Sequence, residues 1–104
     1  MSKPPEFYAR MKDLHPDLMR AYEALADAAK EAGPLDVKTV ALIKLALSLG
    51  AGLEGATHSS VRKAIAAGST PAEIRHTAIL GVTTLGFPAM MRARAWVEDV
   101  LDHG

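Results

Sequence analysis

The chain contains no cysteine among its 104 residues. Disulfides, thiolate metal sites and thiol-based catalysis are therefore excluded for this sequence. Aromatic residues are also scarce, at 5%, whereas apolar residues make up 49% and alanine and leucine are abundant. This composition favours helices that pack through small and aliphatic side chains over a β-sandwich.

The sequence has no excess of charge of either sign. Lysine plus arginine and aspartate plus glutamate number 12 each, so the formal net charge is zero. A nucleic-acid-binding protein normally needs a positive field, so no nucleic-acid partner is expected. A helix-turn-helix over residues 54–85 is conceivable, but its second helix is rich in isoleucine, leucine, valine and alanine, which counts against it.

Long apolar runs and a secretion signal are also missing. No apolar stretch reaches the roughly 18 residues that a membrane-spanning helix needs. The start of the sequence has no basic segment followed by an apolar one. We therefore expect a soluble cytoplasmic protein with no membrane contact.

Apolar residues recur with the period of a helix along most of the chain, and no strand-type alternation of useful length is present. A loose start with a short helix is expected within residues 1–15, followed by helices at residues 16–31, 37–49, 53–68, 71–85 and 88–101. Asp36 is a plausible N-cap, and Thr70 with Glu73 matches a capping box. The length suits a single core. The sequence thus predicts one all-α domain over residues 1–104, a compact bundle of five or six helices.

The helix expected over residues 37–49 carries apolar side chains on nearly every side. A helix of this kind is buried in a core or in a subunit interface, and a chain of this length can hardly enclose one whole helix. The helix over residues 71–85 also carries more apolar surface than a small monomer easily buries. We therefore expect a homo-oligomer.

The segment over residues 53–68 is the best candidate for a site, because it combines acidic, histidine and hydroxyl side chains. At about 100° per residue, one face points into the core and carries Leu53, Thr57, Ser60, Val61 and Ala64. Glu54, His58 and Arg62 follow its border at i, i+4 spacing. A carboxylate beside an imidazole can hold one tautomer and raise its basicity, as a general base requires. The alternative is that these three side chains only form a solvent-exposed row along the helix, in which each neighbouring pair stabilises the helix by a few tenths of a kcal/mol.

The other polar side chains give weaker signals. The hydroxyls of Thr57 and Ser60 are expected to bond back to carbonyl groups of their own helix, and a nucleophilic serine would also need a base and an oxyanion site. No second histidine falls three or four residues from His58 or His76, so no metal site is expected, and no cofactor is implied. His103 is placed in a frayed tail.

Several stretches carry a resemblance to a known family. They are residues 35–39 leading into Leu42-Ile43, residues 58–68, and residues 69–74, and the most specific run is Ala-Ala-Gly-Ser-Thr-Pro-Ala-Glu-Ile at residues 66–74. Their order and spacing resemble the carboxymuconolactone decarboxylase and alkylhydroperoxidase D superfamily over about two thirds of the chain. The sequence Gly86-Phe87-Pro88-Ala89 is similar to the decarboxylase branch in particular. The resemblance implies an all-helical fold assembled into trimers or hexamers.

The peroxidase branch of this superfamily, with its peroxiredoxin-type chemistry, carries a Cys-x-x-Cys pair, a histidine four residues later and an upstream glutamate. With Gly68 as the anchor, the cysteines fall on Leu53 and Ala56, the histidine on Ser60 and the glutamate on Ala41. All four positions lack the reactive group. The chain itself therefore cannot reduce peroxides through thiols.

The decarboxylase branch also places a histidine at the position held here by Ser60. His58 lies two residues earlier, which on a helix moves the side chain about 200° round the axis. The resemblance thus carries over the fold and the place of the pocket, but His58 is a simple substitute for the family histidine only if the register or the start of the helix differs.

The first hypothesis is a decarboxylase-like lyase that binds a small acidic or lactone-like metabolite in a helical pocket near residues 54–60. His58 would transfer a proton, and Glu54 would orient the imidazole ring of His58. The catalytic candidates are His58, Glu54 and Ser60, and the substrate-binding candidates are Thr57, Arg62 and Arg92. The alternative is a non-catalytic oligomeric binding or scaffold protein that has lost the redox site. A third reading, in which a partner chain supplies the thiols, ranks lowest.

Overall fold

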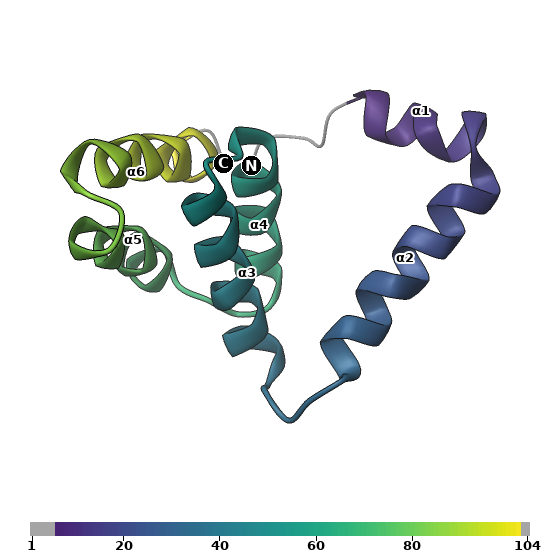
Figure 1. The fold of residues 1–104 in the computed structure, drawn as a ribbon, viewed down its shortest axis with the longest axis horizontal. Helices are drawn as coiled ribbons and strands as arrows, with labels where there is room; N and C mark the ends of the chain where they lie inside the picture. The colour runs from purple at the N-terminus through teal and green to yellow at the C-terminus, as the bar shows by residue number, and fades with distance from the viewer. Residues whose placement is uncertain (1–5, 103–104) are drawn as a thin grey trace. The chain divides into compact units, whose positions relative to one another are not determined.

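The protein is all-helical, as the sequence predicts. The computed structural model describes residues 6–102, which contain six α-helices, one 3₁₀ segment and no strand. The elements are α1 (Glu6–Leu14), α2 (Pro16–Glu31), α3 (Val37–Ala51), α4 (Glu54–Ala66), α5 (Pro71–Ile79), η1 (Leu80–Thr83) and α6 (Phe87–Leu101), coloured in chain order in Figure 1. A loose start with a short helix was predicted within residues 1–15; its residues 1–5 and the tail at His103 lie outside the described residues.

Contacts divide the chain into two units, one with α1 and α2 and the other with α3 to α6. In the first unit, Lys12 and Glu23 join α1 to α2 by an ion pair of 3.2 Å between Nζ and Oε2. Met19 is the buried side chain of α2, whereas Leu18 and Leu25 are exposed. The single domain over residues 1–104 stays a prediction.

Two helix starts are capped as the sequence predicts. The backbone N–H of Thr39 donates to Asp36 Oδ1 at 2.7 Å. Thr70 and Glu73 form the full capping box, with Glu73 N donating to Thr70 Oγ1 at 3.1 Å and Thr70 N donating to Glu73 Oε1 at 2.8 Å. Lys38 reaches Glu73 from α3 at 2.6 Å, and Lys38 and Thr70 together hold the pKa of the Glu73 carboxyl below its ordinary value. The start of α5 is thus fixed both locally and by α3.

The helix predicted over residues 71–85 is shorter than expected. It is α-helical to Ile79, continues as the 3₁₀ segment η1, and then turns, with Leu85 N donating to Gly81 O at 2.7 Å. Gly81 lowers helix propensity by about 1 kcal/mol, and two threonines follow it. The apolar pattern alone did not reveal this weakness.

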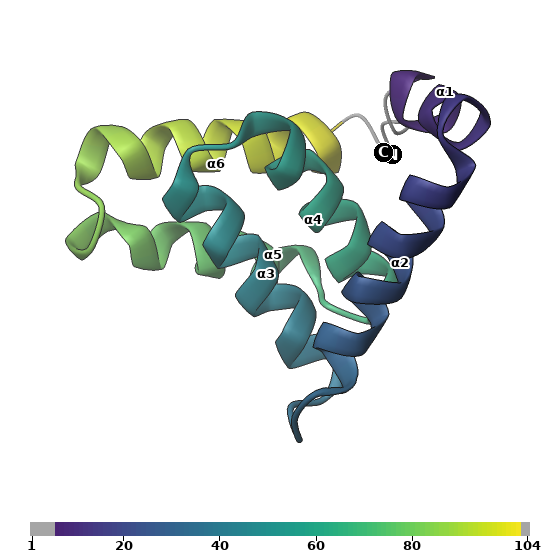
Figure 2. The ribbon, with the colours of Figure 1, turned by 45° about the vertical axis from the view of Figure 1, so that its right-hand side comes forward.

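The core lies in the unit of α3 to α6. Figures 1 and 2 show α3 beside α4 and α5 beside α6. The buried cluster consists of Leu45, Leu49, Val61, Ala64, Ile74, Ala78, Ala93, Val97 and Val100. The predicted inward face of residues 53–68 is confirmed except at its first member. Leu53 is 54% exposed because it is the extended N-cap of α4, where the helical periodicity does not yet apply.

Helix α3 is apolar on more sides than the unit covers. Leu45 and Leu49 are its buried residues, whereas Val37, Ile43 and Leu47 are exposed, Leu47 by 66%. On the neighbouring segment, Ile79 and Leu80 are exposed as well.

None of the helices within residues 6–102 combines the length and apolar character needed to cross a bilayer.

Candidate functional site

The centre of the candidate site is a hydrogen bond between His58 on α4 and Asp99 on α6. His58 Nε2 lies 3.0 Å from Asp99 Oδ2, across the packed pair of α4 and α6. The His58 side chain is 25% exposed, so the ring is held by the protein and yet reachable from solvent. When Nε2–H donates to Asp99, the lone pair of the neutral ring lies on Nδ1. Nδ1 is then the nitrogen that can accept a proton.

Glu54 lies near this pair but is not its hydrogen-bonding partner. Its carboxylate is one helical turn before His58, and the three groups of Glu54, His58 and Asp99 each offer an atom within 4.8 Å of the others. Sequence spacing predicted Glu54 as the partner that orients His58. The structure gives the ring hydrogen bond to Asp99, 41 residues along the chain. Local spacing carries no signal for such a partner, because it depends on how α6 is turned against α4.

Glu98, the neighbour of Asp99, anchors α6 to α5. Arg75 Nε donates to Glu98 Oε1 at 2.6 Å and Arg75 Nη2 to Oε2 at 3.1 Å, and Arg94 Nη1 donates to Oε1 at 2.7 Å. The hydrogen bonds from Arg75 and then from Arg94 lower the pKa of the Glu98 carboxyl to about 2. This network fixes the turn of α6 that carries Asp99.

The hydroxyl of Ser60 is directed away from His58. Ser60 Oγ lies 3.0 Å from Ser48 Oγ on α3, and Ser48 Oγ donates to Lys44 O at 3.0 Å. Since a hydroxyl has one proton, Ser60 donates to Ser48 in this chain of bonds. The expectation that Ser60 bonds back to its own helix is therefore wrong. Ser60 joins α4 to α3, and the structure does not bring it together with His58.

Thr57 is fully buried, and its Oγ1 has no hydrogen-bond partner among the described residues. The expected bond to a carbonyl of its own helix is therefore not formed. An unsatisfied buried hydroxyl costs about 1–3 kcal/mol. The sequence predicted that Thr57 binds substrate, and its burial keeps it from a ligand that rests on the surface beside His58.

The two arginine candidates come from different helices. Arg62 follows His58 by one turn on α4 and is half-buried. Arg92 is an exposed residue of α6, and its guanidinium lies over the Trp96 ring at 5.0 Å. Its Nη2 would be 3.2 Å from a Cβ added at Gly52, whose φ is +70°. The close approach and the left-handed backbone both favour glycine there, and they place Arg92 against the turn that leads into α4.

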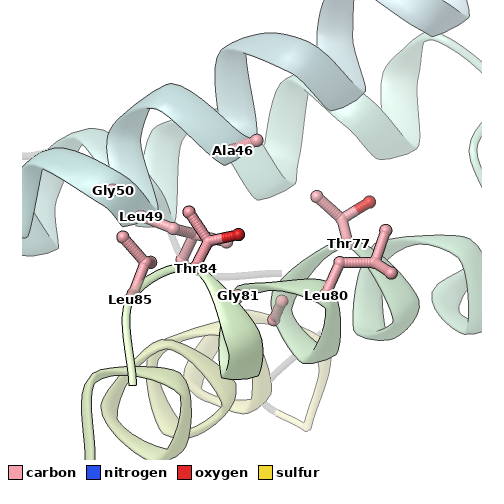
Figure 3. Close-up of a pocket in the computed structure, with 9 residues that line it drawn as sticks. Ala46, Leu49, Gly50, Thr77, Leu80, Gly81, Thr84 and Leu85 are labelled. Carbon is pink, nitrogen blue, oxygen red and sulfur yellow. The ribbon is translucent and has the colours of Figure 1, made fainter. Parts of the chain in front are cut away.

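A pocket of about 310 Å³ lies on another side of this unit, between α3, α5 and η1 (Figure 3). Ala46, Leu49 and Gly50 line it from α3, and the facing wall consists of Thr77, Ala78, Leu80, Gly81, Thr84 and Leu85. Thr77 already donates its hydroxyl to Glu73 O at 2.9 Å. This pocket is apolar, and none of its lining residues belongs to the predicted site at residues 54–60.

Comparison with known proteins decides the family. A model of the carboxymuconolactone decarboxylase family matches residues 16–99, which is most of the chain. The chain belongs to the carboxymuconolactone decarboxylase family. The suspected relationship is thereby confirmed, and the matched region includes His58, Asp99 and both arginine candidates.

A solved structure agrees with this assignment. The crystal structure of the apo form of a carboxymuconolactone decarboxylase family protein from Legionella pneumophila is similar, with a TM-score of 0.78 and 28% sequence identity. The match covers 91% of this chain and 85% of that chain. A comparison with curated proteins gave no match. Within the family, this member has no cysteine with which to build a thiol redox site.

Proposed function

We propose that this family member binds a small acidic or lactone-like metabolite beside His58 and transfers a proton to or from it. The observation that carries this proposal is the His58–Asp99 hydrogen bond of 3.0 Å. A carboxylate that accepts from one ring nitrogen fixes the tautomer and stabilises the imidazolium that forms on protonation. His58 is thus the proton-transfer group and Asp99 its positioning partner.

A ligand with a carboxylate group needs a cation to offset the carboxylates of Glu54 and Asp99 beside His58. Arg62 and Arg92 are the candidate cations, and the planar guanidinium of arginine binds carboxylates through two parallel hydrogen bonds. Glu54 offers a carboxylate oxygen within 4.8 Å of the His58 ring nitrogen, so its negative charge adds to that of Asp99. Ser60 and Thr57 contribute by packing α4, since the one bonds to Ser48 and the other is fully buried.

Decarboxylation is the reaction that this arrangement and the family together support. The bond between the ligand carbon and its carboxylate breaks, CO₂ leaves, and the electron pair moves into a neighbouring carbonyl group. His58, protonated from solvent, then delivers its proton to the carbon that lost CO₂ as the electron pair returns from the carbonyl group, and water protonates the neutral ring again. The residues needed are one positioned acid–base group and one cation for the substrate, and the chain offers both.

We expect the purified protein to release CO₂ from a lactone that carries a ring carboxylate, because the imidazole can protonate the carbon that loses CO₂. Turnover is measured by a coupled CO₂ assay over a panel of such lactone acids. Methyl esters of the same compounds are the matched control, and we expect them to bind more weakly since the arginines lose their carboxylate partner. Absence of both turnover and binding across the panel would contradict the proposal.

That negative outcome would favour a non-catalytic binding or scaffold protein. A specific observation supports this second candidate. The pocket of about 310 Å³ lies apart from His58 and has an apolar lining, so it suits an apolar ligand or side chain and brings no acid–base group to it. Binding of apolar compounds without turnover would identify it.

We also propose that the chain forms a homo-oligomer, a trimer or hexamer, through the apolar surface of α3 and α5–η1. The exposed residues that define this surface are Val37, Ile43, Leu47, Ile79 and Leu80. Helices α3 and α5 pack against each other, and exposed apolar surface of this kind is typical of interaction sites.

In light scattering after size exclusion, we expect the wild type to elute with a mass well above one chain. Leu47→Glu should shift it toward the monomer, because a charge in the interface is costly. Ala66→Glu, at an exposed position of α4 outside this surface, is the control and should leave the mass unchanged. A monomeric wild type would refute the proposal.

A further inference from the structure

Three possible metal ligands converge at the surface between α4 and α6. Glu54 and His58 lie one turn apart on α4, and Asp99 comes from α6. Each offers one ligand atom, and these atoms lie within 4.8 Å of one another. The prediction that no metal binds rested on the spacing of histidines along the chain alone. This spacing cannot reveal a ligand that comes from another helix.

The distances are close to those of a metal site. A tetrahedral zinc ion with bonds of about 2.0–2.1 Å places its ligand atoms roughly 3.3 Å apart. The separation of His58 Nε2 and Asp99 Oδ2 is 3.0 Å, so these two atoms need little movement to share an ion. Glu54 is exposed and lies in the first turn of its helix, so a change of rotamer can bring its carboxylate to the same ion.

The chemistry of the three groups also fits. One imidazole and two carboxylates are a ligand set that zinc and similar divalent transition metals accept. Two carboxylates held this close repel each other, and a divalent cation between them removes that repulsion. Arg62, one turn beyond His58, adds a positive charge that opposes the ion, so moderate affinity is expected.

We propose that Glu54, His58 and Asp99 form a three-ligand site for a divalent transition metal, with zinc as the best fit. Three protein ligands leave the fourth position of the ion to water, and the partial exposure of His58 and Asp99 gives the ion a path of entry. A bound ion takes the same ring nitrogen that otherwise donates to Asp99. The metal-bound state and the proton-transfer state of His58 therefore exclude each other.

The inference does not depend on turnover, so its test is direct. Metal-free protein is titrated with zinc chloride by isothermal titration calorimetry, and we expect one zinc ion per chain for the wild type. His58→Gln and Asp99→Asn should each weaken binding by about tenfold or more. His76→Gln removes an exposed histidine of α5 outside the cluster, and it should bind zinc as the wild type does.

Far-UV circular dichroism of each variant verifies that it is folded, and Asp99→Asn keeps the size of a half-exposed side chain. Cobalt serves as a second probe, because its visible spectrum reports tetrahedral coordination in the wild type. Equal zinc affinity in wild type and Asp99→Asn would overturn the three-ligand site and leave a lone histidine as the binder. A loss of zinc affinity in His76→Gln equal to that in Asp99→Asn would overturn the three-ligand site as well.

Discussion

Replacement of His58 by glutamine is expected to lower the kcat for substrate turnover by about 100-fold or more. Glutamine keeps much of the size and polarity of the imidazole but cannot take up or release a proton. Its side chain can still bond to Asp99, so the packing of α4 against α6 should survive. Steady-state kinetics in the presence of a chelator measure the effect, and we expect the loss in kcat with a much smaller change in KM.

Two further variants separate proton transfer from positioning. Asp99→Asn removes the charge that stabilises the imidazolium while it keeps the shape of the side chain, so an intermediate loss of kcat is expected. His76→Gln changes an exposed histidine on α5 and should leave turnover at the wild-type level. If His58→Gln retains wild-type kcat, His58 is not the proton-transfer group, and the binding or scaffold function becomes the better account.

The second large effect is expected on stability, at Glu98. Arg75 and Arg94 hold the folded-state pKa of this carboxyl near 2, against an ordinary value of 4.5. Because the folded pKa is depressed, the stabilisation is fully present above about pH 4.5 and is lost as the pH falls toward 2. After allowance for solvent screening of the partly exposed arginines, Glu98→Gln should lower the free energy of unfolding by about 1–2 kcal/mol at pH 7.

Urea unfolding at pH 7 and at pH 3 tests this in the wild type and in Glu98→Gln. The wild type should lose more stability than the variant between the two pH values, since the variant has no carboxyl to protonate there. Asp17→Asn removes a charge that pairs with Arg20 on the surface of α2, and it should change little because exposed ion pairs contribute little. Identical unfolding of wild type and Glu98→Gln at pH 7 would show that the network does not stabilise the fold.

The sequence alone determined those features that depend on near neighbours in the chain. Asp36 caps α3 through Thr39, and Thr70 and Glu73 cap α5, in each case over three residues. The amphipathic period identified the helices and the inward face of α4. Such contacts follow from backbone geometry, so they can be predicted without knowing where any other helix lies. Leu53 and the end of α5 were missed, because a cap residue and a glycine-weakened turn interrupt the period.

Tertiary structure alone decided the site. The contacts that define it join His58 to Asp99, Ser60 to Ser48 and Glu98 to Arg75, over 41, 12 and 23 residues respectively. Each depends on how two helices are rotated and how closely they approach, and one sequence does not encode these quantities locally. The sequence therefore placed His58 on the border of α4 beside Glu54. Only the packing of α6 against α4 gave that histidine its carboxylate partner, and with it the arrangement on which both proposals rest.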